Sequence, residues 1–231
     1  MSEQAEIIDL TASRSLIDVR GGGFDLALVM GGQPIALNWS DCEGSVAQYL
    51  ARAGRTDCES ELRSLRHTLA GHWLPEAPIS SQIYPFIELM VPGRYELRYV
   101  ESCPDCSYIE FDSSWDFDAK YDHYYPFGST LVLTRATDSL SQGQVTHYLE
   151  RIRSGYRPIA LTVTASEGWC NFVLDGHHKL RAYKMAGVKP AFVSVCRLDA
   201  PRVGAESFDK WIGANHPMAS RYRKVKTKYD T

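Results

Sequence analysis

Residues 158–196 read PIALTVTASEGWCNFVLDGHHKLRAYKMAGVKPAFVSVC, and this stretch decides the fold. Pro158–Thr164 and Trp169–Leu174 are short apolar runs rich in β-branched and aromatic residues, which is typical of strands. Lys179–Ala186 predicts a helix that ends at the glycine after it. Ala191–Cys196 predicts another strand. Strands that alternate with helices indicate an α/β or α+β arrangement.

The residues on either side extend this pattern. Leu131–Thr134 is a short apolar run that predicts a strand, and Ser141–Arg153 has apolar residues at helical spacing. We therefore expect an α+β fold whose C-terminal domain covers residues 128–200. Residues 201–231 are expected to add a helix over Ser207–Ile212 and a basic tail.

Residues 1–127 predict a separate α+β region that is rich in β-hairpins. Paired glycines and a Pro-Gly pair supply the turns, because such residues suit tight hairpin connections. A proline in the second strand of the first hairpin would place that strand at a sheet edge. The expected hairpins are Phe24–Met30 with Gln33–Trp39, and Tyr84–Val91 with Tyr95–Glu101.

Two helices and a long loop complete the expected N-terminal region. Helices are predicted from Ser40 to Ala53 and from Thr56 to Leu69, because each begins with the hydroxyl and glutamate spacing of a capping box. Tyr108–Phe111 predicts a short strand. Residues 112–128 are rich in aspartate and aromatic residues, and we expect a surface loop that could hold Mg²⁺ or simply be solvated.

The composition indicates an ordinary globular chain. It has 231 residues and a formal net charge of −3, so the molecule as a whole does not attract nucleic acid electrostatically. No apolar run approaches the roughly 20 residues needed to cross a bilayer, and the first residues do not resemble a signal peptide. We therefore expect a cytoplasmic protein without a membrane partner, whose six cysteines are reduced.

The turn Asp175-Gly176-His177-His178-Lys179 is the candidate site. It joins a predicted strand to a predicted helix, and the first N–H groups of a helix attract anions. The two histidines and the lysine add donors, which suits a phosphate chain, whereas Asp175 can act as a base, hold a metal or cap the helix. The alternative is a plain turn with solvated histidines, because short motifs often occur by chance.

The run SGYRPIALTV, followed by FVLDGHHKLRAYKMAGVKPAFVSV, resembles the core of the ParB/sulfiredoxin superfamily. The shared pattern is a helix, a strand, a second strand, a DGHH-type turn, a helix that ends in Ala-Gly, and a closing strand. It covers roughly Gly128–Leu198. The resemblance implies a mixed sheet and a nucleotide-phosphate site at Gly176, His177, His178 and Lys179. The sulfiredoxin nucleophile is a cysteine, and His177 stands in its place.

Among members of this superfamily, the DGHHK turn is most similar to that of the free-serine kinases. This resemblance implies ATP or ADP with Mg²⁺ as cofactor and a phosphotransferase or nucleotide hydrolase that acts on an unknown small-molecule or protein acceptor. For such an enzyme we expect Asp175 to act as a base or metal ligand and His177 and His178 to stabilise developing negative charge, so these three are the candidate catalytic residues. Arg135 and Arg181 are the further candidates for nucleotide contacts.

Two alternatives to an enzyme remain at this point. A ParB-like module or nuclease could bind DNA through the basic residues of the C-terminal tail, while an interaction protein would bind no nucleotide. The Cys103-Pro-Asp-Cys106 motif could be redox-active, could supply half of a zinc site, or could be a turn between strands. The basic residues of the tail are Arg221, Arg223, Lys224, Lys226 and Lys228.

Overall fold

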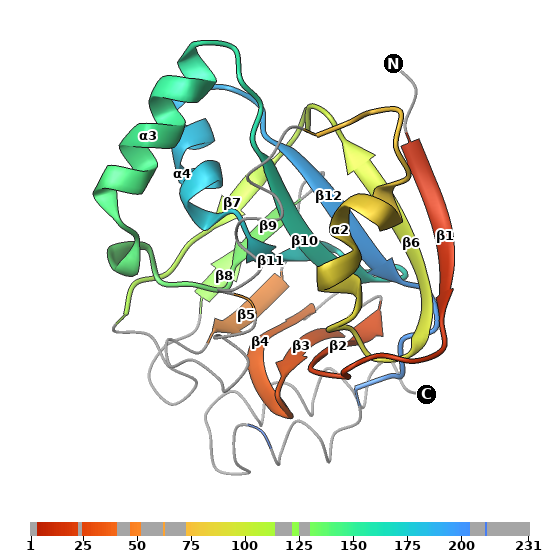
Figure 1. The fold of residues 1–231 in the computed structure, drawn as a ribbon. Helices are drawn as coiled ribbons and strands as arrows, with labels where there is room; N and C mark the ends of the chain where they lie inside the picture. The colour runs from red at the N-terminus through yellow and green to blue at the C-terminus, as the bar shows by residue number, and fades with distance from the viewer. Residues whose placement is uncertain are drawn as a thin grey trace.

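Two β-sheets and three helices make up the part of the chain that the computed structural model describes, namely residues 4–22, 25–40, 47–51, 62, 73–113, 122–124, 130–203 and 211. One sheet has seven strands and the other has five. The sheets pack against each other, and two of the helices cover the far face of the larger sheet (Figure 1). The predicted α+β class is therefore confirmed.

The seven-stranded sheet is mixed and has the order β1-β6-β12-β10-β11-β9-β7. Its central strands β12 and β10 are parallel, and β10 is antiparallel to β11. Strands β1, β6 and β7 precede residue 128, whereas the other four follow it, so both halves of the chain share one sheet. The strands are β1 (Gln4–Leu10), β6 (Gly93–Val100), β7 (Ser107–Ile109), β9 (Thr130–Leu133), β10 (Ile159–Ala165), β11 (Cys170–Asp175) and β12 (Ala191–Arg197).

The five-stranded sheet is antiparallel throughout, in the order β2-β3-β4-β5-β8. It contains the predicted glycine hairpin, since β3 and β4 flank Gly31 and Gly32. Pro34 lies inside the sheet and not at an edge as expected; the pairing of β3 with β4 shifts register there and accommodates it. The strands are β2 (Ile17–Gly22), β3 (Asp25–Met30), β4 (Gln33–Ser40), β5 (Ala47–Ala51) and β8 (Asp122–Tyr124).

Two apolar clusters lie on opposite faces of the seven-stranded sheet. One fills the space between the two sheets and helix α2 (Ile79–Ile87), and it includes Leu28, Phe86 and Leu161. The other lies beneath α3 (Gln142–Arg153) and α4 (His177–Ala186), and it includes Leu149 and Tyr183. The α3–α4 layer thereby brings the predicted motif to one face of the sheet.

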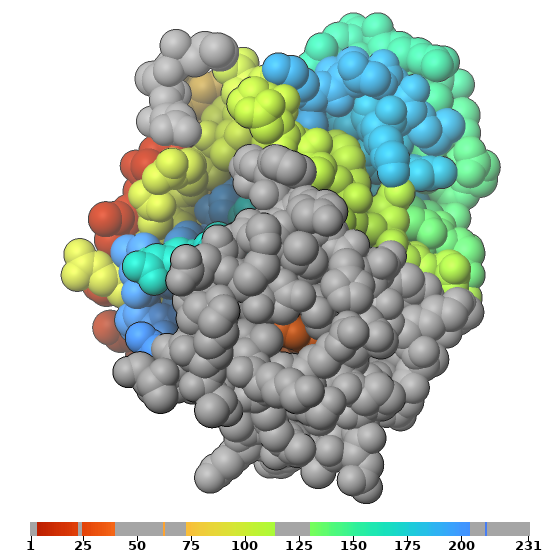
Figure 2. Space-filling model, turned by 180° about the vertical axis from the view of Figure 1, so that it is seen from behind, coloured from red at the N-terminus to blue at the C-terminus, as the bar shows by residue number. Residues whose placement is uncertain are grey.

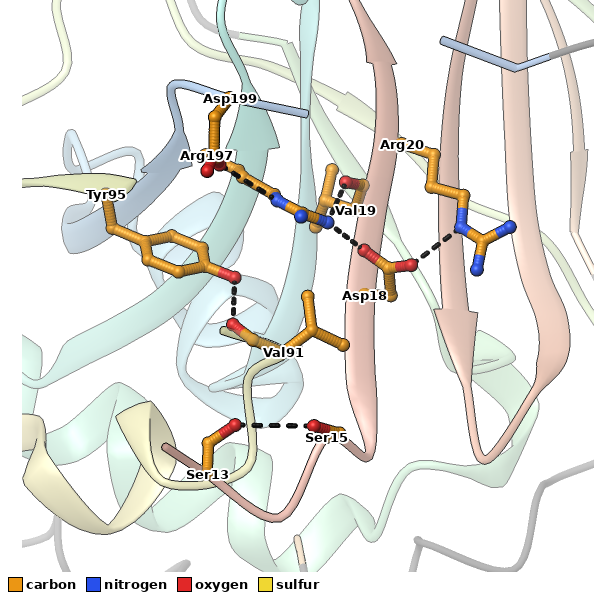
Figure 3. Close-up of polar contacts among 9 residues, drawn as sticks. All are labelled: Ser13, Ser15, Asp18, Val19, Arg20, Val91, Tyr95, Arg197 and Asp199. Atoms are coloured by element: carbon orange, nitrogen blue, oxygen red, sulfur yellow. Dashed lines mark hydrogen bonds and ion pairs between the residues drawn. The ribbon is translucent and has the colours of Figure 1, made fainter. Parts of the chain in front are cut away.

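A buried ion pair joins the two sheets. Arg197, at the end of β12, donates from Nη1 to Asp18 of β2, and both residues are at most 9% exposed (Figure 3). Arg20 donates to the other oxygen of Asp18 at 2.6 Å, and Asp199 accepts from Nε of Arg197 at 3.2 Å. Each buried charge therefore has an opposite charge and a hydrogen bond, as burial in an apolar interior requires.

Most of the C-terminal expectations are confirmed, and several N-terminal ones are wrong. The helix expected to end at Ala53 is wrong because Ala47–Ala51 is strand β5. The strand expected over Tyr84–Val91 is wrong because these residues overlap α2, where Ile83 and Ile87 repeat at a spacing of four residues and face the core. Residues 112–128, expected to be a loop, contain strand β8.

Other expectations fall largely outside the described residues. The second capping-box helix is represented by Leu62 and the C-terminal helix by Trp211, and each of these residues is helical. The basic tail lies wholly outside. Within the described part of the chain, no helix combines the length and apolar character needed to cross a bilayer.

Candidate functional site

A glycine with positive φ connects β11 to α4 at the predicted motif. Gly176 has φ +98° and precedes the first helical residue, His177. A Cβ atom at Gly176 would lie 2.8 Å from Cα and 2.7 Å from Cβ of Ala160 on the neighbouring strand. The backbone conformation and the close approach of β10 both require glycine, which explains the abrupt passage from strand to helix.

A pocket of about 70 Å³ opens at the start of α4. The DGHHK motif forms one wall, and residues from α3 and from the segment after β9 form the rest. The pocket thus joins Leu62, residues 135–148 and residues 174–179, which are 73 and 26 residues apart in the sequence. Its lining residues are Leu62, Arg135, Gln144, Tyr148, Leu174, Asp175, Gly176, His177, His178 and Lys179.

Lys179 and Asp175, which both line the pocket, form an ion pair. Lys179 Nζ lies 3.1 Å from Asp175 Oδ2 and also donates to the carbonyl oxygen of Ile159 at 2.8 Å. The Lys179 side chain is 4% exposed and the Asp175 side chain 17% exposed. The Tyr148 ring lies 6.0 Å from Nζ, at the outer limit of a cation–π contact. Protein groups therefore hold the ammonium group expected to bind phosphate.

His177 is buried against the end of β9. Its Nε2 lies 3.3 Å from the backbone nitrogen of Thr134 and 3.2 Å from the Thr134 hydroxyl. That hydroxyl also lies 2.5 Å from the carbonyl oxygen of Val173, to which it donates. A hydrogen bond from the backbone N–H of Thr134 needs an unprotonated Nε2. A hydrogen bond to a lone pair of the Thr134 hydroxyl oxygen needs a protonated Nε2. The two contacts therefore cannot both be hydrogen bonds of a single protonation state of the ring.

We predict that Thr134→Val lowers the free energy of unfolding by about 1–2 kcal/mol, because the buried carbonyl of Val173 loses its donor. Thr134→Ser keeps the hydroxyl and serves as the matched control, with a smaller loss expected. Urea unfolding of the two variants measures the difference. Equal stabilities would mean that the hydroxyl contributes nothing here.

His178 connects α4 to α3. The backbone N–H of Ser141, the residue that caps α3, donates to His178 Nε2 at 3.1 Å. This bond needs a neutral ring with its proton on Nδ1, so the ring can donate only through Nδ1. The expected donor role of His178 toward phosphate is therefore limited to Nδ1.

Arg135 brings a second positive charge to the pocket. Its Nε and Nη2 donate to the hydroxyl and the carbonyl oxygen of Ser139 at 3.1 and 3.2 Å, so the loop after β9 orients the guanidinium group. Among the lining residues, the positive charges of Arg135 and Lys179 and the negative charge of Asp175 give a net formal charge of +1. The N-terminal end of α4 adds the positive end of a helix dipole. The electrostatics therefore favour an anion.

The size of the pocket limits the ligand. Pockets that enclose drug-sized ligands measure roughly 300–1,000 Å³, so a pocket of about 70 Å³ is far too small for a whole nucleotide. A single phosphate group is a better match. Any nucleoside attached to that phosphate would lie outside the pocket.

Some predicted residues lie elsewhere, and some lining residues were not predicted. Arg181 does not line the pocket; its Nη1 lies 3.3 Å from Glu110 Oε1. Gln144 and Tyr148 of α3 were missed, although their spacing of four residues marks one face of that helix. Burial raises the pKa of Tyr148, and the charge of Asp175 raises it further, so this phenol stays protonated as a donor.

The lining residues do not form a magnesium site of their own. Asp175 is the one carboxylate among them, and its Oδ2 is paired with Lys179. In the described part of the chain, no group of three or more histidine, cysteine or acidic side chains could hold a metal ion. The expected Mg²⁺ would therefore have to arrive on the phosphates of a nucleotide.

Comparisons of the chain with protein-family models, curated proteins and solved structures match nothing. The resemblance to the ParB/sulfiredoxin superfamily thus depends on the DGHHK motif and on the order of the elements around it.

Proposed function

We propose that this protein binds a nucleotide by inserting a phosphate group into the pocket at the start of α4, and that it transfers or hydrolyses that phosphate. The observation that carries the proposal is the convergence of Gly176, the first turn of α4 and the Arg135 guanidinium on one small, positively charged pocket. The ParB/sulfiredoxin-like turn supports the same ligand class. ATP and ADP are the nucleotides that this resemblance favours.

The charged and polar groups around the first turn of α4 have defined parts in the proposed reaction. The backbone N–H groups of the first turn of α4 bind the phosphate oxygens, and Arg135 stabilises the negative charge that develops during transfer. Lys179 contributes charge without direct contact, because Ile159 and Asp175 hold its ammonium group. His177 and His178 position the first turn against Thr134 and Ser141, respectively.

Asp175 is the proposed base. Its Oδ2 is bonded to Lys179, which leaves Oδ1 to accept the proton of an attacking hydroxyl or water. The attacking oxygen forms a bond to the terminal phosphorus while the bond from that phosphorus to the leaving nucleotide breaks, which releases ADP from ATP or AMP from ADP, and the proton passes to Asp175. Positioning and electrostatic stabilisation account for most of the catalysis in such reactions.

We expect ATP or ADP to raise the melting temperature of the wild-type protein and to have no such effect on His177→Ala/His178→Ala. A ligand at one hundred times its Kd stabilises the folded state by about 2.7 kcal/mol, which corresponds to roughly 5–10 °C for a chain of this length. Differential scanning fluorimetry with ATP, ADP, CTP and inorganic phosphate, each with and without Mg²⁺, makes the measurement.

Two variants make this experiment specific. Arg181→Ala changes a charge on the same helix outside the pocket and should keep the full shift. Arg135→Gln changes a partly exposed side chain in the pocket without removing a buried ring, and it should reduce the shift. If no nucleotide shifts the wild-type protein, the proposal is wrong and an interaction protein becomes the better reading.

Turnover separates an enzyme from a simple nucleotide binder. We expect wild-type protein to release ADP or inorganic phosphate from ATP, and Asp175→Asn to lose that activity while still binding ATP. Turnover at the wild-type rate in Asp175→Asn would remove the aspartate from the mechanism.

A further inference from the structure

The C-x-x-C motif lies far from the phosphate pocket in sequence, in the connection between β6 and β7. Pro104 and Asp105 form a turn, with Cys103 before it and Cys106 after it. Residues at the first and fourth positions of a β-turn have Cα atoms less than about 7 Å apart. Disulfides usually join Cα atoms that are roughly 4.4–6.8 Å apart. The backbone at this turn is thus compatible with a disulfide.

Both side chains face the same apolar cluster. Cys103 is 2% exposed and belongs to the cluster beneath α4, together with Tyr183 and Phe192, while Cys106 packs against it and stays half-buried. The backbone N–H of Cys103 donates to the carbonyl oxygen of Pro190 at 3.1 Å, which fixes this end of the turn just before β12. The two sulfur atoms are thereby held on one side of the turn.

The sulfur atoms interact with each other as thiols. Neither cysteine is in a disulfide. A hydrogen bond with the Cys103 sulfur raises the pKa of Cys106, and burial raises it further. A protonated thiol is a poor nucleophile, so the pair should react slowly at neutral pH and faster as the pH rises.

We propose that Cys103 and Cys106 are a reversible disulfide site that reacts by exchange with a small disulfide such as oxidised glutathione. The sulfur of Cys106, which is the more exposed, attacks the small disulfide and releases one thiolate, forming a mixed disulfide. The sulfur of Cys103 then attacks Cys106 Sγ and releases the second. The protein loses two protons and two electrons, and one small disulfide becomes two small thiols.

Oxidation would act on β7, an edge strand of the seven-stranded sheet, which begins immediately after Cys106. Glu110 follows this strand and forms ion pairs with Arg181 at 3.3 Å and Lys184 at 2.5 Å, both on α4. Figure 2 shows residues of this segment against α4. A disulfide at the start of β7 would therefore restrain the segment that supports α4, whatever ligand the pocket at the other end of that helix binds.

The test is peptide mapping of the full chain after equilibration with oxidised and reduced glutathione. The protein is incubated at pH 7 and at pH 8.5, quenched with acid, alkylated in denaturant and digested. We expect the peptide that contains Cys103 and Cys106 to lose two hydrogen atoms and to escape alkylation, with a faster reaction at pH 8.5. Added dithiothreitol should restore both thiols.

Single variants check the order of the two steps. Cys103→Ser should stop at a glutathione adduct on Cys106, whereas Cys196→Ser should leave the disulfide unchanged. Cys196 lies on β12, outside the turn, so its substitution leaves both sulfur atoms of the pair in place. Persistence of both free thiols in the wild-type peptide, a disulfide from either cysteine to a third one, or one zinc ion per chain that is lost in Cys106→Ser would each overturn the proposal.

Discussion

Gly176→Ala is expected to destabilise the protein by roughly 2–6 kcal/mol and to abolish nucleotide binding. Two effects add at this position. An L-residue with φ near +98° is strained, at a cost of order 1–3 kcal/mol. The new methyl group would also overlap Ala160 at 2.7 Å, and overpacking of this kind costs about 1–3 kcal/mol. Relief of the overlap would displace the first turn of α4, which forms the anion site.

Gly155→Ala is the matched control for this prediction. Gly155 has φ +96°, nearly the same as Gly176, but nothing lies within 4 Å of the place where its Cβ would be. Its substitution should cost only the backbone strain, about 1–3 kcal/mol. Chemical denaturation of both variants measures the difference. Equal losses would show that contact with Ala160 does not determine the turn.

Arg197→Met is expected to lower the free energy of unfolding by about 2–4 kcal/mol, because it leaves the buried Asp18 carboxylate without its Arg197 partner. The loss should fall below the usual upper range for broken buried pairs, since Arg20 still donates to Asp18 at 2.6 Å. Equilibrium urea unfolding checks the value. The variant should weaken the contact between the two sheets, because this ion pair connects β12 to β2 (Figure 3).

Two further variants show whether burial is the cause. Arg94→Met removes a surface pair with Asp9, in which both side chains are more than half exposed, and should change stability by less than about 0.5 kcal/mol. Asp18→Leu/Arg197→Met removes both buried charges and should recover most of the stability that Arg197→Met loses. A double variant as unstable as the single one would mean that the arginine contributes by packing.

The sequence alone determined the C-terminal half of the fold and the centre of the candidate site. Residues 158–196 alternate strand, strand, helix and strand, as predicted, and the helix begins directly after Gly176. Local features suffice there, because glycine at the turn and apolar periodicity in the helix agree with each other. The N-terminal half was harder. Residues 47–51 follow a capping-box signal yet pair as strand β5, because partners on β4 and β8 outweigh local preference.

Only the tertiary structure decided how the site is completed. Sequence patterns could not show that Thr134 and Ser141 contact the two histidines, since these contacts span 43 and 37 residues. Sequence patterns also suggested that Lys179 binds phosphate. Its ammonium group instead donates to a carbonyl oxygen 20 residues away in the sequence. Sequence patterns likewise could not show that strands β1, β6 and β7 belong to the same sheet as the strands of residues 130–197. Turn residues predict the pairing of strands that a short loop connects, as at Gly31 and Gly32, but they do not specify partners far apart in the sequence, which emerge only when the whole chain is packed.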